Sequence, residues 1–191
     1  MIDLDILILI SHKKEVPSEF KSLGICTVSI QSLQANDFRK FSLKYPVLCI
    51  ITGVGHRATL NALTYILKYI NSKLILNLGS SGSSNPNYIN QAVCPIELTF
   101  NQQIAYSLGC FPFLIKSTPI HIIKTCESVT SISIHKHTDC IDMEAYWQAE
   151  FCNRHNIPFV CLKFVTDNND SHLRQTYHKN LSRMNHNFNT I

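Results

Sequence analysis

The stretch "VLCIITGVGHRATLNALTYILKYINSKLILNLG" (residues 47–79) decides the fold class. Its two ends, "VLCIIT" (47–52) and "KLILNLG" (73–79), are short apolar runs rich in residues that favour strands. Such runs are typical of strands covered on both faces in a largely parallel sheet. The proline-free segment between them (56–72) carries apolar residues near helical spacing. The stretch therefore predicts a strand–helix–strand unit.

The same alternation continues on both sides of this unit. "DILILI" (5–10) is another buried-strand pattern, and "EVPSEFKSL" (15–23) predicts a helix with its proline in the first turn. "QAVCPIELTF" (91–100) and "PIHIIKT" (119–125) predict strands, and the segment between them shows no clear period. With no internal repeat and no linker, residues 1–191 are expected to form one α/β domain.

The composition indicates a compact globular protein. The chain has 191 residues, of which 45% are apolar and 16% charged, and this is long enough to bury a core. Its formal charge of +4 comes from scattered Lys and Arg, without the basic run of a nucleic-acid groove. The opening "MIDLDILILI" lacks the basic start of a secretory signal, and the other apolar stretches are too short to span a bilayer. The eight cysteines form no CxxC pair and indicate buried, reduced thiols. Taken together, the charge pattern, the missing secretory signal and the short apolar stretches lead us to expect a cytoplasmic protein without nucleic-acid or membrane partners.

A second helix–strand pair carries acids at both ends, in "CIDMEAYWQAEFCNRHNIPFVCLKFVTDNND" (140–170). Residues 143–152 predict a helix, and "FVCLKFVT" (159–166) predicts a buried strand. Asp167 then follows the strand, at the sheet edge where ligands gather in open α/β folds. Glu144 lies near the helix start, where offsetting the helix dipole is an alternative explanation for an acid.

Four segments, taken in order, resemble the purine nucleoside phosphorylase and nucleosidase superfamily: "ISHKKEV" (10–16), "TGVGHRATLNAL" (52–63), "LNLGSSG" (76–82) and "IDMEAYWQAEFCNRHNIPFVCLKFVTDNND" (141–170). The chain is most similar to the branch of methylthioadenosine/S-adenosylhomocysteine nucleosidases and futalosine hydrolases. The resemblance covers most of the chain outside residues 84–122. It implies a three-layer α/β/α sandwich with a central mixed, largely parallel sheet, a homodimer, and no cofactor or metal.

The resemblance also implies the catalytic roles. Breaking an N-glycosidic bond to a purine requires an acid at the base, a carboxylate for the sugar and an activated water. In the family's pattern Asp167 protonates the purine at N7, which requires it to carry a proton near neutral pH. Glu144 binds the ribose hydroxyls, and Met143 packs on the sugar. Glu15 positions the nucleophilic water.

Further positions near the substrate follow from the same resemblance. Ser80 would contribute near the sugar and the water, while Gly79 and Gly82 would let the backbone approach the ligand closely. Val129 aligns with a phenylalanine that stacks on adenine in related nucleosidases, and it offers area without a π-face. An aromatic surface would then have to come from another residue of the middle segment: Phe100, Phe111 or Phe113.

Hydrolysis is favoured over phosphorolysis. Phosphorylases typically hold phosphate with arginines. Phosphorylases that resemble this chain have one of these arginines two residues before the first glycine of the "GSSG" segment, and this chain has Asn77 at that position. Glu15 would repel phosphate. Three basic residues leave phosphorolysis open: Lys13, Lys14 and Arg57. The predicted function is a purine nucleoside N-ribohydrolase, and the alternatives are a phosphorylase or a catalytically inactive nucleoside-binding relative.

Several other features have simpler explanations. In "HKHTDC" (135–140), His135, His137 and Cys140 are candidate metal ligands, but a solvated loop is the favoured interpretation because no second ligand cluster accompanies them. The tail from residue 171 onward predicts a polar helix whose histidines need no function. Lys163 replaces the family's arginine before the acid motif, and so keeps the charge without the planar fork.

Overall fold

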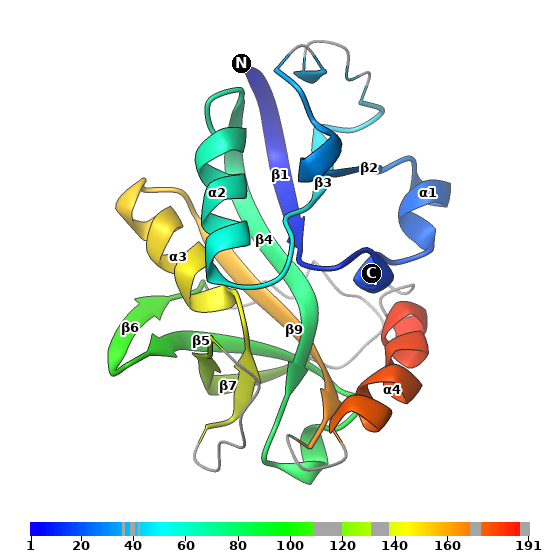
Figure 1. Ribbon diagram of the computed structural model, residues 1–191, viewed down its shortest axis with the longest axis vertical. Helices are drawn as coiled ribbons and strands as arrows, with labels where there is room; N and C mark the ends of the chain where they lie inside the picture. The colour runs from blue at the N-terminus through cyan, green and yellow to red at the C-terminus, as the bar shows by residue number, and fades with distance from the viewer. Residues whose placement is uncertain are drawn as a thin grey trace.

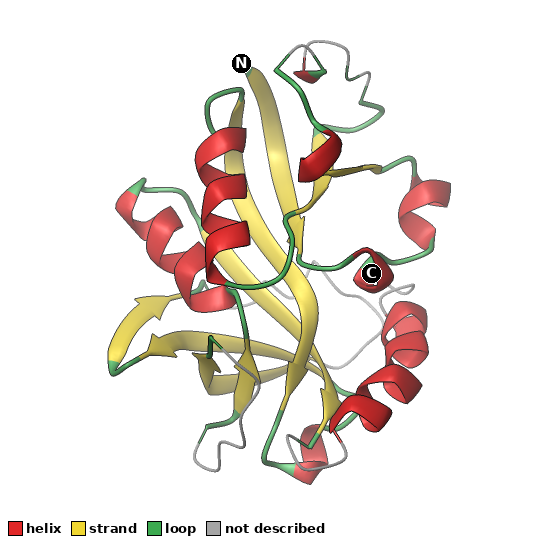
Figure 2. Cartoon of the chain, viewed as in Figure 1, coloured by secondary structure: helices red, strands yellow, loops and turns green. Residues whose placement is uncertain are grey.

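The computed structural model describes residues 1–35, 37–38, 41, 43–108, 120–130, 138–168 and 173–187. Its strands are β1 (Ile2–Ile10), β2 (Cys26–Ser29), β3 (Val47–Ile51), β4 (Ile70–Gly82), β5 (Ala92–Phe100), β6 (Gln103–Tyr106), β7 (Ile120–Ser128), β8 (Cys140–Asp142) and β9 (Phe159–Asp167). Its α-helices are α1 (Glu19–Leu23), α2 (His56–Ile66), α3 (Ala145–Arg154) and α4 (Leu173–Asn187). Short 3₁₀ turns are η1 (Lys13–Glu15), η2 (Ile30–Ser32) and η4 (Pro86–Tyr88). Strands and helices therefore alternate as predicted over most of the described chain (Figure 2).

The strands form one mixed, largely parallel sheet, as expected. The hydrogen-bonded order is β2-β3-β1-β4-β8-β7-β5-β6, and β9 pairs with both β4 and β5. The pairs β1–β3, β1–β4, β2–β3, β4–β9, β5–β7 and β7–β8 are parallel, whereas β4–β8, β5–β6 and β5–β9 are antiparallel. Because β1, β4 and β9 run in the same direction, their carboxyl ends share one edge of the sheet.

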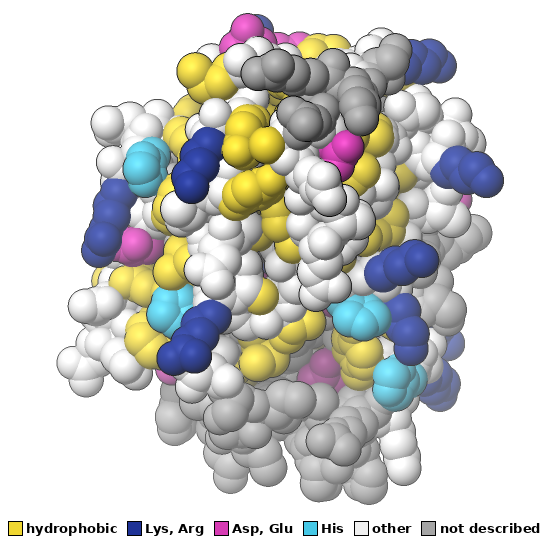
Figure 3. Space-filling view, turned by 45° about the horizontal axis from the view of Figure 1, so that its top comes forward, with side chains coloured by type: hydrophobic (Ala, Val, Ile, Leu, Met, Phe, Trp, Pro, Cys, Tyr) yellow, Lys and Arg dark blue, Asp and Glu magenta, His cyan; other side chains and the backbone are white. Residues whose placement is uncertain are grey.

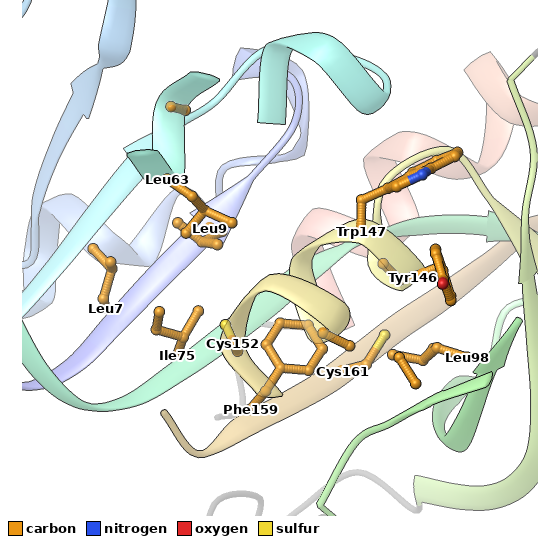
Figure 4. Packing of buried hydrophobic residues seen from close by; sticks show 14 of the residues in the cluster. Leu7, Leu9, Leu63, Ile75, Leu98, Tyr146, Trp147, Cys152, Phe159 and Cys161 are labelled. Atoms are coloured by element: carbon orange, nitrogen blue, oxygen red, sulfur yellow. The ribbon is translucent and has the colours of Figure 1, made fainter. Parts of the chain in front are cut away.

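Helices cover both faces of the parallel strands, which gives the predicted three layers (Figure 1). Along β1, Leu7 and Leu9 belong to the cluster that contains residues of α2 and α3, whereas Ile8 and Ile10 belong to the cluster with α1 and α4. This alternation follows from the two-residue repeat of a strand. Figure 4 shows the first cluster, in which Leu63 lies over Leu9 and the Cys152 and Phe159 side chains pack together.

Two predicted helices are shorter in the structure, and the helix predicted over 143–152 is shifted by two residues, to Ala145–Arg154. The helix predicted over 56–72 ends at Ile66, since Ile70 already pairs with Ile2 in the sheet and is buried in the core. The helix predicted over 15–23 is also shorter. It begins at Glu19, after Pro17, and Glu15 lies in the preceding 3₁₀ turn.

The segment without a clear period contains β6, and its residues 109–119 lie outside the described part. Across the described residues, no helix is both long enough and apolar enough to cross a membrane. Figure 3 shows Lys and Arg side chains scattered over the visible face, in keeping with the absence of a basic run in the sequence.

Candidate active site

A cavity of about 250 Å³ opens at the sheet edge where β1, β4 and β9 end. Six of the seven residues predicted for the site line it: Glu15, Ser80, Val129, Met143, Glu144 and Asp167. The seventh, Gly79, lies beneath it, because a Cβ atom built there would be 3.5 Å from the Glu15 Oε2 atom. Gly82 lines the cavity as well. The fold thus brings together residues that are up to 152 positions apart (167 − 15).

Glu15 is held firmly by donors from two segments. The backbone N–H of His12 (3.3 Å) and the Ser11 hydroxyl (3.1 Å) donate to Oε2. The backbone N–H of Ser80 (3.3 Å) and the Ser80 hydroxyl donate to Oε1. Only 3% of Glu15 is exposed, so the carboxylate is oriented toward the cavity by a nearly complete set of hydrogen bonds.

Glu144 occupies the N-cap position of α3, but its side chain does not cap that helix. Its Oε1 accepts a hydrogen bond of 2.6 Å from the backbone N–H of Gly55, in the turn between β3 and α2. Gly55 has φ 88°, a conformation that favours glycine. Offsetting the dipole of α3 is therefore not a sufficient explanation for Glu144, because its carboxylate binds a different segment.

The environment of Glu144 alters its acidity. Burial, followed by the neighbouring Asp142 carboxylate, raises the pKa of this carboxyl to about 7. Lys163 and the Gly55 N–H act in the opposite direction and lower the pKa. Glu144 therefore changes its charge within the neutral pH range.

Asp142 caps α3 in place of Glu144. Its Oδ2 accepts from the backbone N–H groups of Ala145 (2.7 Å) and Glu144 (3.2 Å). The same oxygen lies 2.8 Å from the Lys163 ammonium, and both side chains are 1% exposed. Burial alone would lower the pKa of Lys163, but Asp142 and other neighbours raise it above its ordinary value, so the lysine is charged.

Asp167 is the last residue of β9 and is paired in register with Gly82 of β4. The Thr166 hydroxyl donates to Asp167 Oδ2 at 2.9 Å. The Asn180 side chain of α4 donates to the Thr166 carbonyl at 2.8 Å, which fastens this helix to the end of the strand. Asp167 is 4% exposed and faces the same cavity as Glu15 and Glu144.

Sequence reasoning missed the contribution of α4 to the site. Tyr177 and His178 line the cavity, and so does His12 of the first loop. Burial, followed by the Glu15 charge, raises the pKa of Tyr177 to about 12, so its phenol is neutral near pH 7. The Ser80 side chain is a hydrogen-bonding neighbour of that phenol. The polar composition of the tail gave no signal of this placement.

Val129 lines the cavity as expected, but Phe100 does not supply the missing aromatic surface there. The Phe100 ring packs against Tyr146 and Trp147, with ring centroids 5.8 and 4.9 Å apart. Phe111 and Phe113 lie outside the described residues.

The basic residues considered for phosphate binding do not line the cavity. Lys13, Lys14 and Arg57 are exposed, and within the described ranges no lysine or arginine lines the cavity. Asn77 is fully buried and accepts a hydrogen bond from the Cys161 thiol at 3.5 Å. In the described part of the chain, no group of three or more His, Cys, Asp or Glu side chains could hold a metal ion. The candidate ligands His135 and His137 lie outside the described residues.

No protein-family model matches the sequence, and no curated protein is similar enough to match it. Solved structures match along nearly the whole chain. A 5'-methylthioadenosine/S-adenosylhomocysteine nucleosidase from Helicobacter pylori, with butyl-thio-DADMe-Immucillin-A, is 14% identical with a TM-score of 0.77 over 99% of this chain and 96% of its own. A nucleosidase of the same name from Chlamydia trachomatis is 17% identical, with a TM-score of 0.72 over 99% and 94%. The futalosine hydrolase of Helicobacter pylori is 14% identical, with a TM-score of 0.74 over 98% and 93%. The protein therefore has the fold of the methylthioadenosine/S-adenosylhomocysteine nucleosidases and futalosine hydrolases.

Proposed function

We propose that the protein is a purine nucleoside N-ribohydrolase of the methylthioadenosine/S-adenosylhomocysteine or futalosine type, which cleaves the N-glycosidic bond with water. The observation that carries this proposal is the meeting of three buried carboxyl groups from distant segments in one cavity: Glu15, Glu144 and Asp167. Buried acids are costly to a fold unless they are paired or used. The similarity in fold to proteins named as nucleosidases and hydrolases supports the same function.

Asp167 acts as the general acid at the purine. Departure of the base leaves negative charge on the ring, and protonation at N7 by a positioned carboxyl group relieves that charge. The Thr166 hydroxyl, which donates to Oδ2 of Asp167, fixes the orientation of the group. Val129, in the same cavity, supplies apolar contact to the base.

Glu144 and Met143 bind the sugar. The Gly55 N–H holds the Glu144 carboxylate from one side, and the remaining acceptor positions are available for ribose hydroxyls. Met143 is partly exposed in the cavity and packs on the sugar ring. Ionised Glu144 also favours the positive charge that develops on the sugar as the base leaves.

Glu15 and Ser80 hold the attacking water. The carboxylate already receives two backbone donors and two hydroxyl donors, so its position is set before the substrate binds. It accepts a proton from the water as the water attacks the anomeric carbon. Gly79 leaves room beside Glu15, because a Cβ atom there would already contact the carboxylate and the Lys163 ammonium, and a side chain longer than that of alanine would enter the space they occupy.

Water rather than phosphate is the proposed nucleophile. A phosphate dianion beside Glu15 would meet a carboxylate, and no described lysine or arginine side chain lines the cavity to offset that repulsion.

We further propose that residues 1–191 act as a single domain, that two copies form a homodimer, and that the protein is cytoplasmic. The seven described cysteines are all free thiols, which supports a reducing compartment. Light scattering at micromolar concentration tests the dimer: a monomer mass would refute it.

The test of the proposed function is base release from a panel of purine nucleosides that includes methylthioadenosine, S-adenosylhomocysteine and a futalosine analogue. Each reaction is run with and without phosphate, and the sugar product is separated by chromatography. The proposal predicts free sugar at the same rate in both conditions. Sugar 1-phosphate that forms only with phosphate would make the protein a phosphorylase, and binding without base release would make it an inactive relative.

A further inference from the structure

Lys163 is an unusual residue in this protein because its charge lies within the core. Among the described residues it is the only lysine or arginine that is buried, and it is not among the residues that line the cavity. Its ammonium lies 2.8 Å from Asp142 Oδ2 and would be 3.7 Å from a Cβ atom at Gly79. A buried ion pair of this kind adds little net stability compared with well-packed apolar residues, so its presence calls for another explanation.

Asp142 connects this ammonium to the sugar-binding wall. Its Oδ2 accepts from the backbone N–H groups of Glu144 and Ala145, and its Oδ1 accepts from the Ser128 hydroxyl at 2.5 Å. The Ser128 hydroxyl in turn accepts from the Tyr146 N–H at 2.8 Å. The ion pair joins β9 to β8, and the Asp142 carboxylate extends this contact to Ser128 at the end of β7 and to the start of α3, where Glu144 is the N-cap residue.

The titratable groups that interact with Glu144 come from four elements. Asp142 of β8 and Glu15 of η1 are negative, Lys163 of β9 is positive, and Tyr177 of α4 is a neutral phenol near the same group. With Asp167, four buried carboxyl groups share this region with one buried ammonium. Without Lys163, the described charged groups that act on Glu144 would be the carboxylates of Asp142 and Glu15.

We propose that Lys163 and Asp142 are positioning residues for Glu144: Asp142 fixes the backbone at the start of α3, and Lys163 neutralises Asp142 so that the Glu144 carboxylate stays ionised when it binds a sugar. The sugar-binding part of this inference rests on the function proposed above, whereas the placement and charge of Glu144 do not. Neither residue needs to touch the substrate.

The direct test is the titration of Glu144 by ¹³C NMR in protein labelled at glutamate side-chain carboxyls, with Glu144→Gln to assign the signal. Lys163→Met should raise the midpoint of Glu144 by about one pH unit, because a nearby positive charge is lost. Asp142→Asn should lower the midpoint, because a nearby negative charge is lost. Lys163→Arg should keep it near the wild-type value. If the pair were purely structural, Lys163→Met and Asp142→Asn would move the Glu144 midpoint in the same direction or not at all. That result would overturn the proposal.

Matched controls separate charge from general loss of stability. Lys73 and Asp5 form an ion pair of 2.7 Å that is largely exposed, so Lys73→Met should leave the Glu144 midpoint unchanged. Circular dichroism and thermal unfolding show which variants fold. If Lys163→Met does not fold, the downward shift in Asp142→Asn and the retained midpoint in Lys163→Arg decide the question.

An activity measurement then tests the sugar-binding part. KM for the nucleoside should decrease with rising pH, and in Lys163→Met the midpoint of this decrease should move to higher pH together with the Glu144 midpoint. Lys163→Arg should return the KM midpoint to the wild-type value. A changed midpoint with an unchanged KM profile would overturn the link to sugar binding. If the wild-type protein releases no base, the proposed function fails, and the NMR titration still decides whether the pair controls Glu144.

Discussion

Replacing Glu15 by glutamine should abolish most turnover while leaving the protein folded. Each carboxylate oxygen of Glu15 accepts one backbone N–H, from His12 at Oε2 and from Ser80 at Oε1. A glutamine has only one oxygen, so in either orientation of the amide one part-buried backbone N–H faces an NH₂ group. The two serine hydroxyls can turn away, but that backbone donor cannot.

The cost to stability follows from this count. A buried donor left unsatisfied costs about 1–3 kcal/mol, and a part-buried donor falls at the lower end of that range. For a domain of this size each kcal/mol lowers the melting temperature by roughly 2 to 4 °C, so a fall of a few degrees is expected. The loss of proton acceptance from the attacking water should lower kcat by about 10²- to 10⁴-fold. The effect on activity is therefore far larger than the effect on stability.

The assay is steady-state base release by Glu15→Gln on the substrate identified from the nucleoside panel, together with thermal unfolding. Glu19→Gln is the matched control, since Glu19 lies four residues further on and accepts hydrogen bonds from the neighbouring Ser18 hydroxyl. It should change neither kcat nor the melting temperature appreciably. A Glu15→Gln protein with a lowered melting temperature and wild-type kcat would show that Glu15 is structural, and the assignment of the water site would be wrong.

Four further predictions concern the rest of the site. Asp167→Asn should lower kcat at least about 100-fold on a purine nucleoside but spare a nitrophenyl riboside, whose leaving group needs no proton; equal losses on both would refute the acid role. Because the pKa of Glu144 is raised to about 7, KM should fall as pH rises through that value, and Glu144→Gln should remove this dependence. Because of the same raised pKa, the folded protein keeps a proton on Glu144 that the unfolded chain releases above about pH 4.5. The free energy of unfolding that Glu144 contributes should therefore fall as the pH rises from 4.5 to 7, and thermal unfolding across this range measures it. Tyr177→Phe should lower kcat about tenfold with little change in KM, as expected for one hydrogen bond near the Ser80 hydroxyl; an unchanged kcat would place the phenol outside the reaction.

The sequence predicted most of the parallel core because its strands are continuous apolar runs. Their burial on both faces leaves a clear pattern in the segments that became β1, β3, β4 and β9. The end of α2 was placed too late because the apolar residues continue without a glycine or proline into β4, and only the pairing of Ile70 with Ile2 ends the helix.

The proximity of the candidate site residues could be predicted where a segment of sequence resembles a family, but not where contacts join distant segments. Glu15, Glu144 and Asp167 were placed together from such segments, and the structure brings them to one cavity. The Lys163–Asp142 ion pair joins two strands and leaves no periodic signal. Tyr177 lies on a helix whose polar sequence is typical of a solvated surface, and its placement depends on contacts such as that between Asn180 and Thr166.

The central claim is that this cavity splits a nucleoside with water. The most direct measurement is mass spectrometry of the sugar released in ¹⁸O-labelled water with phosphate present. The account predicts free sugar that carries one ¹⁸O at the anomeric carbon, and loss of this product in Glu15→Gln. Sugar 1-phosphate without the label, or no sugar product from any purine nucleoside, would contradict it.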